Sequence, residues 1–441
     1  MKVFFTILVC KLMRLAGSLI GRGSSMPGQI ALKLCPDILG RIKMPKTIIA
    51  VTGSNGKTST VEMIAHVLLS AGKSIAYNKE GSNQIEGVTA LILSSCTLRG
   101  RFKKDILLIE SDERYARYTF RYFQPTHYVI TNLYRDQLTR NGHPQWVYEA
   151  IKQSIPESCR LIINSDDPLV SLFGLGRSNV IRFGMDKQSF STEQNTGIYD
   201  DGKYCPLCGG LIKYDFRHYN HIGSYHCTQC GYKRLEPEYK ITDANLDDGF
   251  LLIGDQDRIH LSFKSIYNAY NILACYALCR DIGIDGKLIS ERIGNYVLKN
   301  GRVTEFRLGK TVGTLLTSKH ENSVSYDQSL RYISNQKEPH AVIVIVDAVS
   351  RKYFTSETSW LWDIDFEILN ESETEHIYLS GRYAFDLAVR FSYTGVDKNR
   401  ISVIQDIPET LESIKAAEHK RLYAITCFSD RDKLLSRVET L

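Results

Sequence analysis

The sequence predicts an α/β protein whose sheets are mostly parallel, and three observations support this class. Short apolar runs of strand type alternate with helical patterns from residue 46 to about residue 300. A second alternating series follows residue 305. A glycine-containing loop joins the first apolar run to the first helix of that series. Apolar strands separated by helices are typical of parallel sheets that are covered on both faces.

The composition is that of an ordinary soluble globular chain, with 43% hydrophobic and 24% charged residues among 441. This length allows two or three domains. The net charge of +6 is spread along the chain, which favours anionic small ligands over a dedicated nucleic-acid surface. Only four of the 11 cysteines have paired C-x-x-C spacing, which suits a reducing cytoplasm better than a disulfide framework.

Residues 1–45 are expected to form an amphipathic helix and a lead-in to the first strand. The apolar stretch 3–10 is too short to span a bilayer and has no clear signal-peptide cleavage site. Residues at helical spacing continue beyond it: Phe4, Ile7, Leu8, Lys11, Leu12, Leu15 and Leu19. Three interpretations stay open, namely a helix docked on its own protein, a basic amphipathic helix on a membrane surface, and a cleaved signal.

Two α/β domains follow this lead-in. The first covers residues 46–304, with strands expected at "TIIAVTG", "KSIAYN", "DILLIES", "THYVITNL", "RLIINSD" and "NVIRFG". An insert rich in Tyr, Cys and Gly interrupts it at about residues 203–234. The second domain, residues 305–441, is smaller and Rossmann-like, with strands expected at "AVIVIVDAV", "EHIYLSG", "RISVIQD" and "RLYAITCF".

The stretch "TGSNGKTS" carries the strongest signal for chemistry. Gly53 and Gly56 let the backbone approach an oxyanion closely, and the following helix points free N–H groups at it. Lys57 supplies positive charge for β- and γ-phosphates, and the Thr58 hydroxyl is placed to hold Mg²⁺. A capped tight turn would explain one glycine and a hydroxyl, but not the lysine. The predicted nucleotide-binding residues here are Gly53, Asn55, Gly56, Lys57, Thr58 and Ser59.

Other polar groups follow strands of the same domain or begin its last helix. Glu110 ends a strand expected beside the loop, where its carboxylate would complete the Mg²⁺ shell; a solvated strand end is the alternative. Open α/β sheets bind ligands at the carboxyl ends of their strands. Three polar residues follow such a strand: Thr131, Asn132 and Asp136. Asn268 and Asn271 start an apolar helix, where helix capping alone would explain them.

The insert contains a pattern of four cysteines. Cys205-x₂-Cys208 and Cys227-x₂-Cys230 are separated by 18 residues, and each second cysteine is followed by glycine. This spacing predicts a closed, structural Cys₄ zinc ribbon. Two disulfides are the competing interpretation, and they fit a cytoplasmic protein poorly.

Several motifs together resemble the Mur ligase superfamily. In chain order they are "VTGSNGKTST", "NKEGSNQIEGVT", "IESDE", "VITNLYRDQLTRNG", "NSDDPL", "NAYNILA" and "NGR". The cysteine insert and the later "TSWLWDIDFE" narrow the resemblance to the MurT family, the ligase-type subunits of bacterial lipid II isoglutaminyl synthases. It runs over nearly the whole chain. The resemblance implies a Mur ligase-type central ATPase domain with an inserted zinc ribbon, and a C-terminal Rossmann-like domain.

The resemblance also implies an activity. The family phosphorylates the free α-carboxylate of D-glutamate in the lipid II stem peptide with ATP, and ammonia then displaces phosphate to give D-isoglutamine. The ammonia comes from a GatD-type class I glutaminase partner. The protein would be cytoplasmic and would meet the inner membrane surface transiently through lipid II. Carried over by position, Lys57 and Thr58 would contact phosphate and Mg²⁺, Glu110 the metal, Asn268 the nucleotide, and Arg302 the ribose or phosphates.

Two motifs depart from the family pattern. Where family members carry an aspartate that completes the partner's Cys-His pair, this chain has Glu357, with Asp363 and Asp365 nearby as substitutes. The family's "KNPAG" loop reads "KHENS" at residues 319–323. Two alternatives to the amidating ligase therefore stay open. One is an ATP-dependent ligase with another acceptor or amine, and the other is a non-catalytic ATP-binding scaffold.

Overall fold

The computed structural model describes residues 1–19, 25–78, 83–136, 141–195, 197–261, 264–296, 303–348 and 357–441. The chain divides into two compact units. The first comprises Met1–Tyr134, Pro144–Thr196 and Asp200–Leu298. The second comprises Arg135–His143, Gly197–Tyr199 and Lys299–Leu441. The second unit is therefore assembled from three separate stretches of chain.

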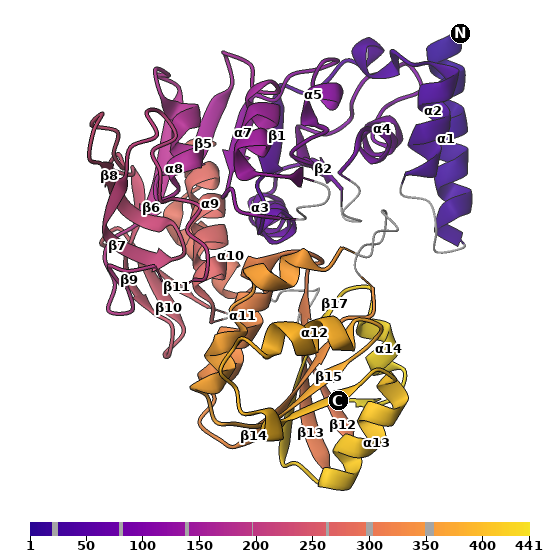
Figure 1. The fold of residues 1–441 in the computed structure, drawn as a ribbon. Helices are drawn as coiled ribbons and strands as arrows, with labels where there is room; N and C mark the ends of the chain where they lie inside the picture. The colour runs from indigo at the N-terminus through magenta and orange to yellow at the C-terminus, as the bar shows by residue number, and fades with distance from the viewer. Residues whose placement is uncertain are drawn as a thin grey trace. The chain divides into compact units, whose positions relative to one another are not determined.

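One large sheet forms the centre of the first unit (Figure 1). Among the described residues it has nine strands, in the order β11-β10-β9-β6-β5-β4-β1-β3-β2. The pairs from β9 to β2 are parallel, and β10 and β11 add antiparallel pairs at one edge. The strands are β1 (Thr47–Thr52), β2 (Ile75–Tyr77), β3 (Ile106–Glu110), β4 (His127–Ile130), β5 (Arg160–Asn164), β6 (Val180–Met185), β9 (Tyr239–Asn245), β10 (Phe250–Ile253) and β11 (Asp257–His260).

The prediction of a mostly parallel sheet is confirmed, and all six strands expected in the first domain are present. The antiparallel β9–β11 edge was not predicted. β1 lies between β3 and β4, with Val51 opposite both Glu110 and Val129. Because these strands are parallel, the residues that follow them meet at one edge of the sheet. This register brings the predicted phosphate loop, Glu110 and Thr131 together.

Helices accompany the sheet of the first unit. They are α1 (Lys2–Leu19), α2 (Met26–Leu34), α3 (Lys57–Ser70), α4 (Ile85–Ser94), α5 (Ala116–Thr119), α7 (Pro144–Lys152), α8 (Pro168–Ser171), α9 (Ile266–Asp281) and α10 (Gly286–Gly294). A short 3₁₀ helix, η2 (Leu172–Gly174), continues α8. α9 is buried almost all round, which fits its nearly uninterrupted apolar sequence. No helix among the described residues is long and apolar enough to cross a membrane.

The N-terminal segment is helical, as the spacing predicts, and one face of α1 docks on the first unit. Ile7 and Cys10 on that face are fully buried in the core that also holds residues of α2 and α4. α2 approaches α4 closely, since a Cβ added at Gly28 would lie 1.8 Å from the Glu86 carbonyl oxygen. Figure 1 shows α1 and α2 side by side.

The insert is a separate two-stranded hairpin, β7 (Ile212–Tyr219) and β8 (Ile222–Cys227). Its small core contains Tyr225 and Tyr232 together with Cys205 and Cys227. Arg234, just after the hairpin, donates to the Asp166 carboxylate at the end of β5 (2.6 Å). The insert is thus anchored to the carboxyl edge of the parallel sheet.

The second unit has its own sheet of seven described strands, in the order β16-β15-β14-β17-β13-β12-β18. The first five are parallel, and β12 pairs antiparallel with both β13 and β18. The bounds are β12 (Val303–Leu308), β13 (Thr311–Ser318), β14 (His340–Ile345), β15 (Thr374–Ser380), β16 (Ile401–Ile404), β17 (Arg421–Cys427) and β18 (Glu439–Thr440). The four predicted strands, β14 to β17, are present, whereas the β12–β13 hairpin was not predicted.

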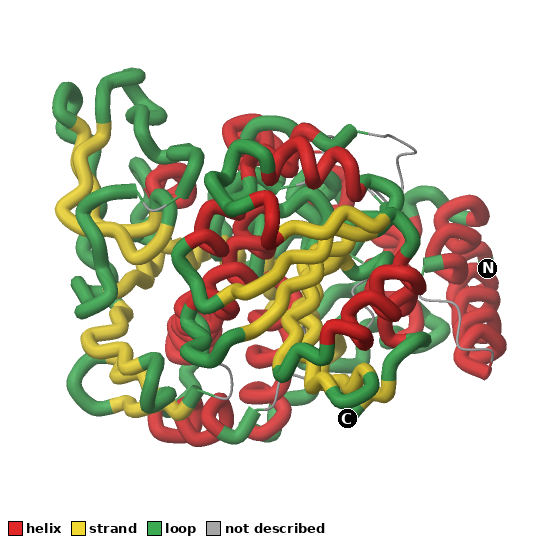
Figure 2. Tube along the Cα trace, turned by 60° about the horizontal axis from the view of Figure 1, so that its bottom comes forward, coloured by secondary structure: helices red, strands yellow, loops and turns green. Residues whose placement is uncertain are grey.

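Apolar cores lie on both sides of this second sheet. The helices are α11 (Ser323–Ser334), α12 (Ala384–Phe391), α13 (Ile407–Ala417) and α14 (Arg431–Leu435). Figure 2 shows the strands of this sheet in yellow, side by side near the C-terminus. Helices on both faces of a largely parallel sheet are the Rossmann-like arrangement that the alternating sequence pattern predicts.

Candidate active site

The loop between β1 and α3 has a backbone that only glycine adopts readily. Gly53 and Gly56 have φ values of 136° and 83°. A Cβ at Gly53 would lie 2.2 Å from the Thr131 hydroxyl oxygen, and a Cβ at Gly56 would lie 1.9 Å from Asn271 Oδ1. A larger residue at either position would therefore collide with its neighbours as well as strain the backbone. The loop leads directly into the first turn of α3.

Side chains that follow β4 hold this loop in place. The Asn55 N–H donates to Asn132 Oδ1 (2.8 Å), and Asn132 Nδ2 donates to the Asn55 carbonyl (3.1 Å). The Thr131 hydroxyl donates to the same carbonyl (2.8 Å). Thr131 and Asn132 were expected at a ligand-binding edge. They lie at that edge, where these hydrogen bonds make them supports of the loop.

Lys57 is buried at the start of α3, and the described contacts of its ammonium include a carbonyl and a carboxylate. It donates to the Gly53 carbonyl and forms an ion pair with the Glu113 carboxylate. Glu113 is 3% exposed. Glu113 was not among the predicted site residues, although it stands in the same "IESDE" stretch as Glu110. The signal available was a second glutamate three residues after the first.

Thr58 and Glu110 are brought into direct contact. The Thr58 hydroxyl donates to Glu110 Oε2 (2.9 Å), and Asn83 Nδ2 donates to Glu110 Oε1 (3.2 Å). The Glu110 N–H donates to Asn78 Oδ1 (2.9 Å), which fixes the end of β3. A hydroxyl and a carboxylate at this distance are oxygen ligands of the type that Mg²⁺ takes in nucleotide sites. The donor set thus fits the predicted metal.

Asn268 and Asn271 lie on the first turns of α9 and are both buried. Asn271 touches the phosphate loop, as its distance to a Cβ at Gly56 shows. Ser59 is half-buried on the first turn of α3. The prediction for Arg302 falls outside the described residues. The structure therefore gathers Gly53, Asn55, Gly56, Lys57, Thr58 and Glu110 at one edge of the sheet, with α9 beside them.

The four cysteines of the insert converge, as their spacing predicts. Their sulfur atoms all lie within 4.8 Å of one another, with 3.6 Å between Cys205 and Cys230 and 3.5 Å between Cys208 and Cys227. The sulfurs are unbonded, because a disulfide requires about 2.05 Å. A regular tetrahedron with Zn–S bonds of ~2.3 Å places neighbouring sulfurs roughly 3.8 Å apart. The cluster has the dimensions of a zinc site.

Backbone N–H groups point at two of these sulfurs. Gly210 donates to Cys208 Sγ and Gln229 to Cys227 Sγ, each at 3.4 Å. The N–H groups of Cys230 and Gln229 lower the pKa of the Cys227 thiol to about 6. N–H groups directed at sulfur stabilise the thiolate form, which is the form that binds metal. At Cys205, by contrast, burial raises the pKa of the thiol to about 12, so the fit to zinc rests on the convergence of the four sulfurs.

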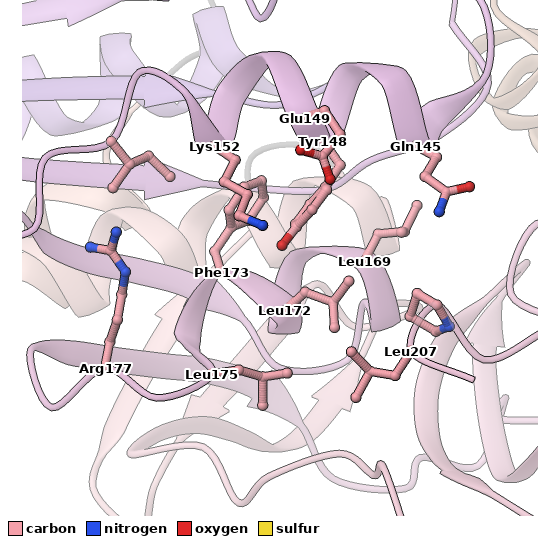
Figure 3. A pocket seen from close by; sticks show the side chains of 12 residues that line it. Gln145, Tyr148, Glu149, Lys152, Leu169, Leu172, Phe173, Leu175, Arg177 and Leu207 are labelled. Atoms are coloured by element: carbon pink, nitrogen blue, oxygen red, sulfur yellow. The ribbon is translucent and has the colours of Figure 1, made fainter. Parts of the chain in front are cut away.

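A cavity of about 350 Å³ lies between α7, α8–η2 and the first cysteine turn of the insert. Figure 3 shows Tyr148 extending from α7 toward Leu169 and Leu172, with Leu207 of the insert facing them. Lys152 and Arg177 are among the residues that line this cavity. None of the predicted phosphate or metal residues lines this cavity.

In the second unit, Glu357 is exposed just before the 3₁₀ helix η3 (Ser359–Asp363). Its carboxylate accepts from the Ser359 N–H (2.8 Å), which lowers the pKa of Glu357. The two nearby acidic residues, Asp363 and Asp365, are less exposed than Glu357. Asp363 accepts from Arg135 (3.1 Å), and burial raises the pKa of half-buried Asp365 to about 6. Glu357 is therefore the most accessible ionised carboxylate of these three.

The "KHENS" loop is also in the second unit and is mostly buried. Lys319 forms an ion pair with Asp136, and Asn322 Nδ2 donates to the other Asp136 oxygen (2.9 Å). Asn322 also caps α11 by accepting from the Ser325 N–H (2.7 Å). The loop thus places Lys319, which it shares with the family motif, and Asn322, which departs from it, on a carboxylate more than 180 residues earlier in the chain.

Comparison with known proteins gives matches in both units. The Mur ligase middle domain family matches residues 51–225, and the MurT ligase C-terminal family matches residues 320–430. A pseudomurein peptide ligase type C from Methanothermus fervidus has a similar fold, with a TM-score of 0.67 at 23% identity. That match covers 88% of this chain and 78% of the other.

Two relatives match over most of their length. The lipid II isoglutaminyl synthase (glutamine-hydrolyzing) subunit MurT of Staphylococcus aureus (strain COL) is 32% identical over 400 residues, covering 90% of this chain and 89% of its own. The corresponding subunit of Streptococcus pneumoniae (strain ATCC BAA-255 / R6) is 30% identical over 420 residues, covering 93% and 91%. The chain therefore belongs to the MurT family of ATP-dependent Mur ligases.

Proposed function

We propose that this chain is the ligase subunit of a lipid II isoglutaminyl synthase. It amidates the α-carboxylate of D-glutamate in the stem peptide, using ATP. Family membership supports the reaction class. The single observation that carries the proposal is the hydrogen bond between Thr58 and Glu110. The buried Lys57 precedes Thr58, and all three residues lie next to the β1–α3 loop.

Each residue has a role that follows from its position. Lys57 and the N–H groups at the start of α3 balance the charge of the ATP phosphates. Thr58 and Glu110 would hold Mg²⁺, which when bound neutralises charge on the transferring phosphoryl group. The substrate carboxylate takes the γ-phosphoryl group and ADP leaves. Ammonia then forms the C–N bond, the C–O bond to phosphate breaks, and the nitrogen loses a proton.

The ammonia source is a GatD-type class I glutaminase that forms a heterodimer with this chain. Glu357 would supply the carboxylate that orients the histidine of the partner's Cys-His pair. Its exposure and its ionised carboxylate suit a role toward a second protein. The Cys₄ cluster holds structural zinc, and Asn268 and Arg302 contact the nucleotide. We place the protein in the cytoplasm.

The ligase half can be tested without the partner. Purified protein is incubated with detergent-solubilised lipid II, ATP, Mg²⁺ and ammonium chloride, and the amidated product is measured by mass spectrometry. We expect product with the native chain and a loss of at least about 100-fold in Lys57→Ala, because one charge-stabilising group is removed. Amidation that persists in Lys57→Ala would contradict the proposed role of the loop.

The metal role has a matched control on the same helix. Thr58→Val removes the hydroxyl that contacts Glu110 and should raise the Mg²⁺ concentration needed for half-maximal rate by about 10-fold or more. Thr60→Val makes the same substitution two residues later, where the buried hydroxyl has no hydrogen-bond partner among the described residues. It should leave the Mg²⁺ dependence unchanged. An equal response of both variants would assign Thr58 a structural role only.

The "KHENS" loop motivates the alternative of another acceptor or amine. ATP hydrolysis in the presence of lipid II without formation of amidated lipid II would favour this alternative. Nucleotide binding without any turnover would favour the scaffold. With glutamine and the partner present, Glu357→Gln should lower amidation while the ammonium-driven rate stays unchanged. A lower glutamine-driven rate with an unchanged ammonium-driven rate would assign Glu357 to the glutaminase half-reaction.

A further inference from the structure

α1 presents an apolar stripe to solvent on the face opposite its docked side. Phe4, Phe5, Leu12 and Leu15 are 48%, 57%, 58% and 65% exposed, and Leu8 is half-buried between them. At 3.6 residues per turn these five positions fall within about 100° of arc. A single exposed leucine is ordinary, but a continuous apolar stripe of this length along one helix marks an interaction surface.

The opposite face fixes the helix, so the stripe has a defined direction. Ile7 and Cys10 are fully buried. Lys11 Nζ donates to the Ser94 carbonyl (2.7 Å), and Arg14 donates to the Ser94 hydroxyl (2.9 Å), both at the end of α4. The stripe is thus held outward by packing and by two cationic side chains anchored on the first unit.

The charge of the chain is concentrated in the same region. Residues 1–46 contain eight basic residues and one acidic residue, a net charge of +7, whereas the remaining 395 residues sum to −1. The basic residues are Lys2, Lys11, Arg14, Arg22, Lys33, Arg41, Lys43 and Lys46. The excess charge of the whole molecule therefore resides in the segment that carries the stripe.

A second basic segment lies against α1. Residues 99–104 include Arg99, Arg101, Lys103 and Lys104. The Gly100 carbonyl accepts from the Lys43 N–H (2.8 Å), and a Cβ at Gly100 would lie 3.6 Å from Val3 of α1. A cavity of about 380 Å³ beside α1 is lined by Arg14 and Lys104 together with Leu91. Positive charge thus lies next to the helix that carries the apolar stripe, beside Val3 and beside Arg14.

We propose that α1 and the 99–104 segment form a docking surface for an anionic phospholipid membrane. The stripe enters the interfacial layer, and the basic side chains lie against the phosphate headgroups. At 18 residues α1 is ~27 Å long and lies in the plane of the interface. The inference rests on residues of the first unit alone and does not depend on the proposed reaction, although it would keep the enzyme near a lipid-linked substrate.

A second copy of the chain is the other occupant to consider, and two observations count against it. Two copies joined through the stripe would bring two segments of +7 together. One exposed face of a single 18-residue helix also offers much less than the ~800 Å² per partner of a standard interface. An anionic bilayer complements the charge and accepts a stripe of this size.

The test is sedimentation of the full chain with vesicles, without substrate or nucleotide. Vesicles of 30% phosphatidylglycerol in phosphatidylcholine are compared with pure phosphatidylcholine. We expect binding to the anionic vesicles that weakens with salt. Leu12→Ser with Leu15→Ser should weaken binding at least 10-fold, and Arg99→Gln with Arg101→Gln about fivefold per charge removed.

Trp146→Ser is the matched control, because Trp146 is a large apolar side chain of the same unit, 72% exposed on α7. It should leave vesicle binding unchanged. The Leu12/Leu15 variant should keep the circular-dichroism spectrum and the melting temperature of the native chain, which shows that it folds. Failure of the native chain to bind anionic vesicles would overturn the proposal and leave the proposed reaction untouched. A lipid-free dimer that the Leu12/Leu15 variant abolishes would assign the stripe to a second copy.

Discussion

Asp327 on α11 is a carboxylic acid in a place where its charged form is unfavourable. It is 2% exposed, and its Oδ1 accepts from the Asp365 N–H (3.2 Å). Burial raises the pKa of Asp327 to about 7 and that of neighbouring Asp365 to about 6. A folded-state pKa above the unfolded value means that the folded protein binds the proton more tightly.

The second unit should therefore lose stability as the pH rises from about 4 to about 7, and change little from this source above pH 7. The full shift of Asp327 corresponds to at most about 4 kcal/mol. Asp327→Asn keeps the accepting oxygen and removes the titration, so it should flatten this slope. Urea unfolding at several pH values measures it, with the exposed Glu338→Gln as control. An unchanged slope in Asp327→Asn would contradict the assignment.

At the scale of elements, the two ends of α3 offer a comparison of glycines. Gly56 precedes the helix and Gly72 follows it, with φ values of 83° and 75°. An alanine at Gly72 would meet nothing within 4 Å, whereas one at Gly56 would collide with Asn271. Both substitutions carry the conformational cost of about 1–2 kcal/mol for a left-handed residue, and only Gly56→Ala adds displacement of the loop.

We expect both variants to lower the free energy of unfolding, but only Gly56→Ala to lose ATP affinity, by about 10-fold or more. Calorimetric titration of the nucleotide separates the two effects. Equal ATP affinity in the two variants would show that the loop tolerates displacement by Asn271 and that its glycine is needed only for conformation.

The insert allows a test by metal removal. Purified protein should contain one zinc per chain, and Cys227→Ser should lose most of it, because one of four thiolates is replaced by a poor ligand. The hairpin core includes two of the cysteines, so the melting temperature should fall by several degrees. Cys159→Ser, at another buried thiol of the first unit, should keep the zinc. Full zinc content in Cys227→Ser would refute the site.

At the scale of the whole molecule, the parallel strands and the phosphate loop were predictable because their signals are local. Each of the six short apolar runs falls within one strand, and "GSNGKTS" covers only the β1–α3 loop and the first turn of α3. The β9–β11 and β12–β13 strands were missed because polar residues interrupt most of them, and the apolar run Phe250–Ile253 is only four residues long. Glu113 was missed because its partner, Lys57, lies 56 residues away. Nothing in a single sequence reports such a pairing.

Sequence patterns also could not predict which stretches of the chain make up the second unit. Residues 135–143 and 197–199 belong to it, although they interrupt the first α/β series. The Asp136 carboxylate accepts a hydrogen bond from Asn322 and forms an ion pair with Lys319. The hydroxyl oxygens of Tyr199 and Ser323 are 2.7 Å apart. These contacts join residues more than 120 positions apart at the start of α11. Domain limits drawn from alternating patterns can only be contiguous.

A fragment of residues 299–441 should therefore be weakened at one place. We expect faster amide hydrogen exchange at the first turn of α11 than in the full chain, because Asp136 and Tyr199 are missing. The described contacts of α13 with β15 and β16 lie within the fragment, so exchange there should match the full chain. Equal exchange at α11 in both proteins would show that the distant contacts add little.

The same three-stretch assembly has a consequence for synthesis. His143 leaves the ribosome 156 residues before Lys299. At about 5–20 residues per second, this delay lasts roughly 10–30 s. Most of the first unit has been synthesised before the residues that contact 135–143 in the second unit. The first unit can therefore begin to fold while residues 135–143 still lack these contacts. Arg135 and Asp136 thus reach their native partners only after residues 319, 322 and 363 have been synthesised.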